Sequence, residues 1–170
     1  MATVMAGLLM PSPSVAQTRT VRDRADDTKP VELSWADVRK VKASYGGGRI
    51  SVTVKVPDLP YSEATLEVYL DRPGNSIYPY IRRLDVEKTG NKTKASLIEY
   101  YDYDGVDHHL PCKVNAKWSL SKHRIKVSAP KSCIHWNAVK LHVVMGALGE
   151  SENGNVYAYD SVKSFKLRYN

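Results

Sequence analysis

Apolar and polar residues alternate on both sides of a run of three glycines, and this pattern constrains the fold more than any other feature of the chain. Residues 40–45 alternate before Gly46-Gly47-Gly48, and residues 49–56 alternate after it, with valine or isoleucine at each apolar position of the second segment. A period of two is typical of a strand with one buried face, and glycine adopts the positive φ values of a tight turn. The pattern predicts an antiparallel hairpin. The β-branched residues directly after the glycines disfavour the helix that a phosphate-binding loop would need.

The same alternation recurs along most of the chain, whereas no window of 11 or more residues shows a 3.6-residue apolar period. Further strands are expected within residues 65–70, 77–86, 93–101, 112–118, 125–127, 139–145 and 162–169. Strands with one apolar face must bury it against another sheet or close into a barrel. The prediction is an all-β fold: an antiparallel two-sheet β-sandwich with jelly-roll or Greek-key connections, about eight or nine strands and one disulfide. A barrel is the alternative.

The first 30 residues differ in composition from the rest. Residues 1–16 carry no charge, their apolar part is too short to span a bilayer, and Ser14-Val15-Ala16 provides the small residues of a cleavage site. We therefore expect a signal peptide at 1–16, a flexible lead-in at 17–30, and a single domain at 31–170. With 170 residues, 42% of them hydrophobic, the chain can bury a normal core.

Two cysteines, Cys112 and Cys133, lie 21 positions apart. If the chain is exported, the simplest interpretation is that these two cysteines form one disulfide. A zinc site built from Asp107, His108, His109 and Cys112 matches no tetrahedral ligand spacing, so no metal is predicted there.

Several short segments resemble a known group of proteins. They are Val54-Lys55-Val56-Pro57-Asp58-Leu59, Leu70-Asp71, and Cys112 followed by Val127-Ser128-Ala129-Pro130-Lys131-Ser132-Cys133. Over roughly residues 23–145 the chain resembles small secreted actinobacterial β-sandwich proteins of unassigned function, similar in outline to DOMON domains and family-9 carbohydrate-binding modules. The resemblance implies the fold and export rather than an activity. The haem of some DOMON domains is not implied, because no axial Met and His pair can be matched here.

The positive charge is concentrated in one part of the chain. Residues 108–149 contain seven Lys or Arg residues and no Asp or Glu, and they account for the whole formal net charge of +7. Strand alternation places many of these side chains on the polar side of their strands. If the strands are neighbours, their side chains form one positive sheet face, which attracts polyanions. The candidate polyanion-binding residues are Lys113, Lys117, Arg124, Lys126 and Lys140. Alternatively, these lysines only protect strand edges.

A tyrosine-rich, acidic segment at residues 99–109 is the second candidate site. Tyrosine rings stack on sugar rings, while carboxylate and histidine groups hold hydroxyls. The candidate glycan-binding residues are Tyr101, Asp102, Tyr103, Asp104 and His108; ordinary strand tyrosines are the alternative. Asp102, Asp104 and Asp107 offer closely spaced oxygen ligands that suit a calcium ion, but the segment lacks the twelve-residue loop with its terminal glutamate. Whether they share a calcium ion is therefore left open.

The chain contains no motif of a hydrolase, metalloprotease, P-loop or dinucleotide-binding enzyme. We expect a secreted, non-catalytic, monomeric domain without a cofactor that binds an extracellular glycan or an anionic cell-wall polymer. The basic stretch lacks interleaved stacking aromatics, so specific nucleic-acid binding is not expected. The alternatives are a cell-surface interaction domain with no small ligand and, more distantly, a small glycoside hydrolase.

Overall fold

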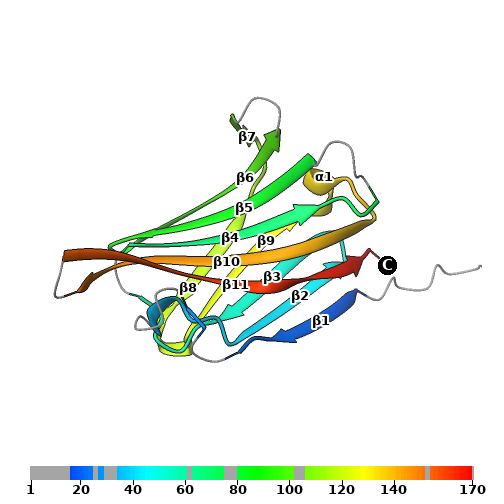
Figure 1. The fold of residues 1–170 in the computed structure, drawn as a ribbon. Helices are drawn as coiled ribbons and strands as arrows, with labels where there is room; N and C mark the ends of the chain where they lie inside the picture. The colour runs from blue at the N-terminus through cyan, green and yellow to red at the C-terminus, as the bar shows by residue number, and fades with distance from the viewer. Residues whose placement is uncertain are drawn as a thin grey trace, which may run out of the picture.

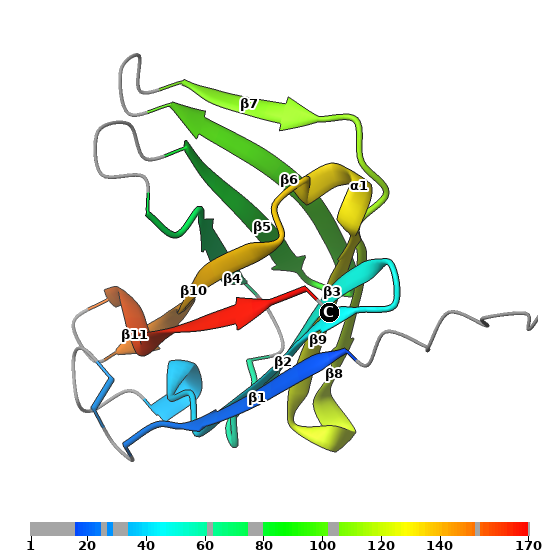
Figure 2. The same ribbon diagram turned by 90° about the vertical axis from the view of Figure 1, so that its right-hand side faces the viewer.

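The protein folds as a sandwich of two antiparallel β-sheets (Figures 1 and 2). The computed structural model describes residues 16–24, 27–28, 34–60, 63–74, 80–101, 106–151 and 154–169. The strands are β1 Gln17–Arg22, β2 Lys40–Gly46, β3 Arg49–Lys55, β4 Ala64–Asp71, β5 Tyr80–Thr89, β6 Lys92–Tyr101, β7 Asp107–Leu110, β8 Asn115–Ser119, β9 Arg124–Pro130, β10 Ala138–Ser151 and β11 Gly154–Arg168. Short helical turns lie at η1 Ser34–Ala36, η2 Leu120–Lys122 and α1 Lys131–Ile134. The predicted antiparallel two-sheet sandwich is confirmed, although the described residues form eleven strands rather than the expected eight or nine.

The strand order is β1-β2-β3-β9-β8 in one sheet and β11-β10-β4-β5-β6-β7 in the other. The chain changes sheets between β3 and β4, between β7 and β8, and between β9 and β10, so strands distant in sequence become neighbours. The β2–β3 hairpin lies where the glycine run predicts it, and Gly47 and Gly48 have φ values of 57° and 75°. A side chain at either position would be strained, because L-residues rarely adopt positive φ.

The core lies between the two sheets and is built from the apolar members of the alternating segments. Val41, Val52 and Val127 come from neighbouring strands of the five-stranded sheet, and Val68 and Val143 come from the other sheet; all five are fully buried. Burying a side chain of this size contributes roughly 1.5–3 kcal/mol. The alternation therefore fixes which side of each strand faces solvent.

A disulfide between Cys112 and Cys133 joins the segment before β8 to α1, with 6.2 Å between the two Cα atoms. The same turn is held by Arg82, which donates to the backbone carbonyl of Ile134 at 2.9 Å and to Glu99 at 2.7 Å. The predicted cysteine pairing is thus confirmed.

The segment that we expected to be a flexible lead-in contains the edge strand β1. Residues 17–22 pair with β2 in register from Gln17–Tyr45 to Arg22–Lys40. Val21 is its only aliphatic residue, so the sequence pattern is weak. The strand forms because its backbone pairs with the open edge of β2. The expected signal peptide at 1–16 lies, except for Ala16, outside the described residues.

Candidate functional site

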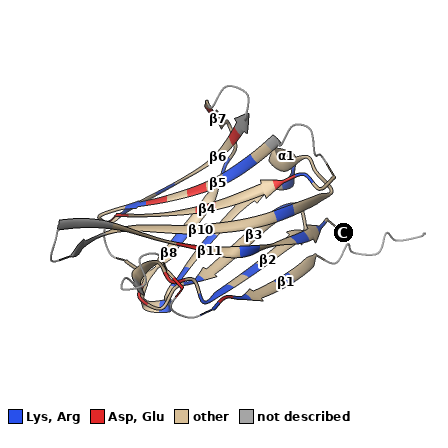
Figure 3. Cartoon of the chain, viewed as in Figure 1, with Lys and Arg blue, Asp and Glu red and all other residues tan. Residues whose placement is uncertain are grey.

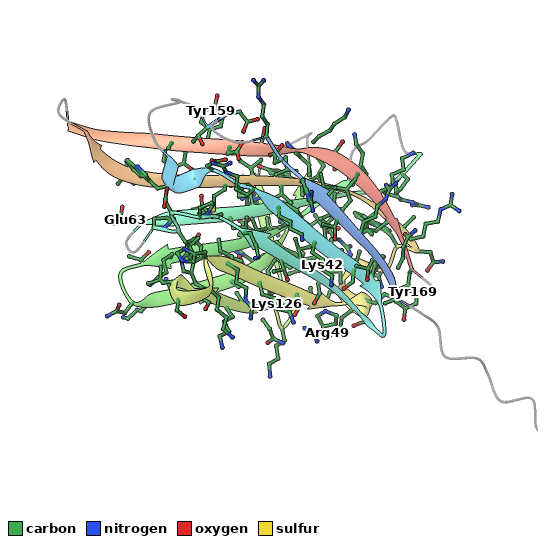
Figure 4. All side chains as sticks on the ribbon, turned by 90° about the horizontal axis from the view of Figure 1, so that it is seen from below. Lys42, Arg49, Glu63, Lys126, Tyr159 and Tyr169 are labelled. Carbon is green, nitrogen blue, oxygen red and sulfur yellow. A yellow bond between two sulfur atoms is a disulfide. The ribbon has the colours of Figure 1, made fainter. Side chains whose placement is uncertain are left out.

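The outer face of the five-stranded sheet carries basic and neutral side chains, and its strands contain no acidic residue. Its strands contain nine Lys or Arg residues and no Asp or Glu: Arg19, Arg22, Lys40, Lys42, Arg49, Lys55, Lys117, Arg124 and Lys126. Eight of these occupy the polar, outward positions of their strands, whereas Arg19 donates across the sandwich edge to the backbone carbonyl of Lys166 on β11. Figure 3 marks Lys and Arg along these strands in blue, and Figure 4 shows Lys42, Arg49 and Lys126 on this sheet.

The strand register aligns the basic side chains in two rows that run across the sheet. In the first row, Arg22 pairs with Lys40, Lys40 with Lys55, and Lys55 with Arg124. In the second row, Lys42 and Lys126 flank Thr53, and Lys126 pairs with Lys117. Neighbouring strands lie about 4.8 Å apart, and residues two positions apart along a strand lie about 6.8 Å apart. We call the seven residues of these two rows the basic face.

The basic face has no acidic partner in the part of the chain that the structure describes. None of its seven residues takes part in an ion pair there. Like charges directly opposite each other on neighbouring strands destabilise a sheet. Four such pairs occur here, so folding brings together charges that repel, and an anion bound on this face would relieve the repulsion.

The six-stranded sheet carries mixed charge. Its strands contain nine Lys or Arg and eight Asp or Glu residues. On its outer face Arg83 forms a two-pronged ion pair with Asp85 and a second ion pair with Asp107 at 3.0 Å, while Tyr69 donates to Glu67 at 2.6 Å. Burial and the hydrogen bond to Glu67 raise the pKa of Tyr69 to about 12. Burial also raises the pKa of Asp85, although Arg83 opposes the shift.

The structure brings four of the five predicted polyanion-binding residues to the five-stranded sheet. Lys117, Arg124 and Lys126 belong to the basic face, and the exposed Lys113 lies just before β8. The prediction that Lys140 shares one face with them is wrong. Lys140 is exposed on β10, which belongs to the six-stranded sheet, and it pairs there with Asp71 and Lys166.

Four residues of the basic face were missed by the sequence analysis: Arg22, Lys40, Lys42 and Lys55. For Lys40, Lys42 and Lys55 the signal was present, because residues 38–57 contain basic residues at polar strand positions and no acidic residue; Arg22 lies in the segment that was expected to be a flexible lead-in. It was missed because this hairpin lies far in sequence from residues 108–149. Only the pairing of β3 with β9 unites the two segments.

The tyrosine-rich candidate site lies largely outside the described residues. Residues 102–104 and the side chain of Tyr101 are not described, so this glycan site and the calcium alternative remain predictions. His108 lies exposed on β7. Asp107 forms an ion pair with Arg83 on β5 of the same sheet, and Cys112 is in the disulfide.

Three carboxylates approach one another where β1 ends. Asp23, Asp27 and Asp160 each have an oxygen within 4.8 Å of the others, a spacing at which carboxylates can share a cation. Asp160 also has a structural role, because it is buried and accepts hydrogen bonds from the backbone N–H groups of Val38 and Ser161, both at 2.7 Å. Burial and the nearby Asp23 raise its pKa to about 6.

No protein-family model matches the chain, and no curated protein matches it either. Over the described residues, none of the helices has the length and apolar character needed to traverse a bilayer. The inference about function therefore depends on the chemistry of the two sheet faces.

Proposed function

We propose that this protein is a non-catalytic domain that binds an anionic polymer outside the cell through the basic face. The observation that carries the proposal is the register of seven cationic residues in two rows, with no acidic residue in any of the five strands. A linear polymer with one anionic group per monomer can follow such rows and contact several cations at once. Neutralising many cations releases counterions and gives affinity that depends strongly on salt.

Protection of strand edges explains the basic face poorly. Lysines at the edge of a sheet discourage pairing with other chains. Here the edge strands are β1 and β8, whereas Lys40, Lys42, Lys55, Arg124 and Lys126 lie on the interior strands β2, β3 and β9. Those strands have neighbours on both sides, so edge protection gives no reason for their charge.

An extracellular location is part of the proposal. A disulfide persists in oxidising compartments, and Cys112–Cys133 is compatible with that environment. Anionic glycans and phosphate-containing wall polymers are the candidate polyanions there, and the basic face offers charge rather than base-stacking aromatics.

The proposal is tested by charge reversal with a control of equal charge. Lys42→Glu/Lys126→Glu reverses two residues of the basic face, and Lys140→Glu/Lys166→Glu reverses two facing, exposed residues of the other sheet. Binding to lipoteichoic acid and to polygalacturonate, with neutral dextran as a blank, is measured by biolayer interferometry. The first pair is expected to weaken polyanion binding by about tenfold or more, and the second by much less. Equal losses in both pairs, or no polyanion binding by the wild type, would contradict the proposal.

A further inference from the structure

A groove lies at one end of the six-stranded sheet, on the side of the sandwich opposite the basic face. Its volume is about 400 Å³, and it is formed where the start of β4, the end of β5, β10 and β11 meet. The residues that matter for its chemistry are Glu63, Thr65, Glu87, Thr89, Leu148 and Tyr157. Ligand-binding cavities typically have a volume of about 300–1,000 Å³, so the groove is large enough for one small ring.

The Tyr157 ring lies at the groove wall in space that Gly146, which has no side chain, leaves open. Its outward position on β11 leaves it 53% exposed, an unusually high value for a large aromatic residue in a strand. A Cβ atom at Gly146 on β10 would lie 1.7 Å from the Tyr157 hydroxyl oxygen. The ring therefore occupies space that only glycine leaves open, and its hydroxyl lies 3.3 Å from Thr65 Oγ1. Tyr157 is thus exposed to solvent, while Gly146 and Thr65 determine where its ring lies.

Two carboxylates, Glu63 and Glu87, are among the polar groups around this ring. Glu63 and Glu87 form no ion pair with any described residue, and they leave two carboxylates beside the aromatic surface. Lys88, the one cation in the wall, already donates to the backbone carbonyl of Gly90. The carboxylates repel anions, so the groove cannot serve the polymer proposed for the basic face. They can accept hydrogen bonds from hydroxyl groups, and the tyrosine ring and Leu148 can cover an apolar surface.

We propose that this groove binds a neutral saccharide ring, stacked on Tyr157 and held through its hydroxyls by Glu63 and Glu87. A pyranose ring has both an apolar face of C–H groups and a rim of hydroxyl donors, which matches this combination. The site is distinct from the basic face in position and in chemistry. It would let the domain hold a neutral glycan on one side and an anionic polymer on the other.

The experiment is native affinity electrophoresis in gels that contain hydroxyethyl cellulose, xylan, mannan or soluble starch, run at high ionic strength to suppress binding by the basic face. The wild type is expected to be retarded by at least one of these polymers. Tyr157→Ala removes the stacking surface, and Gly146→Ala keeps every polar group but displaces the ring. Both are expected to weaken binding about tenfold or more, because the saccharide ring loses the aromatic surface on which it stacks.

Tyr159→Ala is the matched control. Tyr159 lies on the same face of β11 as Tyr157 and is 44% exposed, but it is not one of the residues that line the groove. Figure 4 shows Tyr159 apart from Glu63, which does line it. This variant, and Lys42→Glu/Lys126→Glu, should bind neutral polymer like the wild type; thermal unfolding verifies that each variant folds. No retardation of the wild type by any of the four polymers, or equal loss in Tyr157→Ala and Tyr159→Ala, would overturn this proposal and leave the polyanion proposal standing.

Discussion

Asp160 is an acidic residue in a place where apolar residues predominate. It occupies an inward position of β11, is 3% exposed, and binds the backbone of Val38 through Oδ2. That hydrogen bond ties the segment before β2 to the opposite sheet. Its neighbours Asp23 and Asp27 are also acidic, so the charged form of Asp160 is disfavoured by burial and by repulsion.

This environment predicts that the protein loses stability as the pH rises. The pKa of Asp160 is about 6 in the folded protein and 3.8 in the unfolded chain. Between these values the folded state binds more protons than the unfolded state, so the stabilisation is complete below pH 3.8 and is lost as the pH rises through about 6. The contribution is on the order of 3 kcal/mol. It is measured by urea unfolding at a series of pH values.

Asp160→Asn is the variant that isolates this effect, since an amide does not titrate. The dependence of unfolding free energy on pH should become shallower in this variant. The same pH dependence in both proteins would show that other carboxyl groups, such as Asp23 or Asp85, control the transition.

At the scale of the elements, the disulfide connects α1, the only α-helix among the described residues, to the segment that enters β8. Its two cysteines are 21 residues apart, and α1 is just four residues long. Such a turn has too few hydrogen bonds to hold its position alone. The crosslink and Arg82 fix it beside β5 and β6.

Replacing both cysteines, as Cys112→Ser/Cys133→Ser, should lower the free energy of unfolding by about 3 kcal/mol in the chain-entropy model. The far-UV circular dichroism spectrum should remain that of a β-protein, because the core valines and leucines lie in the strands. Unfolding in guanidinium measures the loss. A variant as stable as the wild type would show that the crosslink does not restrict the unfolded chain.

Local strand patterns were largely predictable, whereas the neighbours of each strand were not. The β2–β3 hairpin follows from alternation around Gly46-Gly47-Gly48, and the inward residues of β4 and β9 follow from the same rule. Alternation indicates the side of a strand that a residue faces, but it does not indicate the sheet that the strand joins. Lys140 was therefore grouped with Lys126, although β10 crosses to the other sheet after α1.

The candidate sites were less predictable for the same reason. The basic face depends on the contact between β3 and β9, whose paired residues Lys55 and Arg124 are far apart in sequence. The groove depends on Tyr157, Thr65 and Glu87 from three strands, and none of these residues belongs to a recognisable motif. Their proximity is a property of the two sheets.

At the scale of the whole molecule, the two outer faces differ in charge and in chemistry. One face has basic side chains and no acidic residue in its strands, and the other combines ion pairs, exposed tyrosines and carboxylates. This asymmetry gives the protein a preferred orientation near an anionic surface, because the net charge of +7 steers the basic face towards it. The opposite face would then point away from that surface.

The most direct test of this account is the slope of log Kd against log NaCl concentration for lipoteichoic acid, compared between the wild type and Lys42→Glu/Lys126→Glu. Several cations acting together predict a steep slope for the wild type, and loss of two of them should reduce it by about 2. A flat slope for the wild type, or an identical slope in the variant, would contradict binding through the five-stranded sheet.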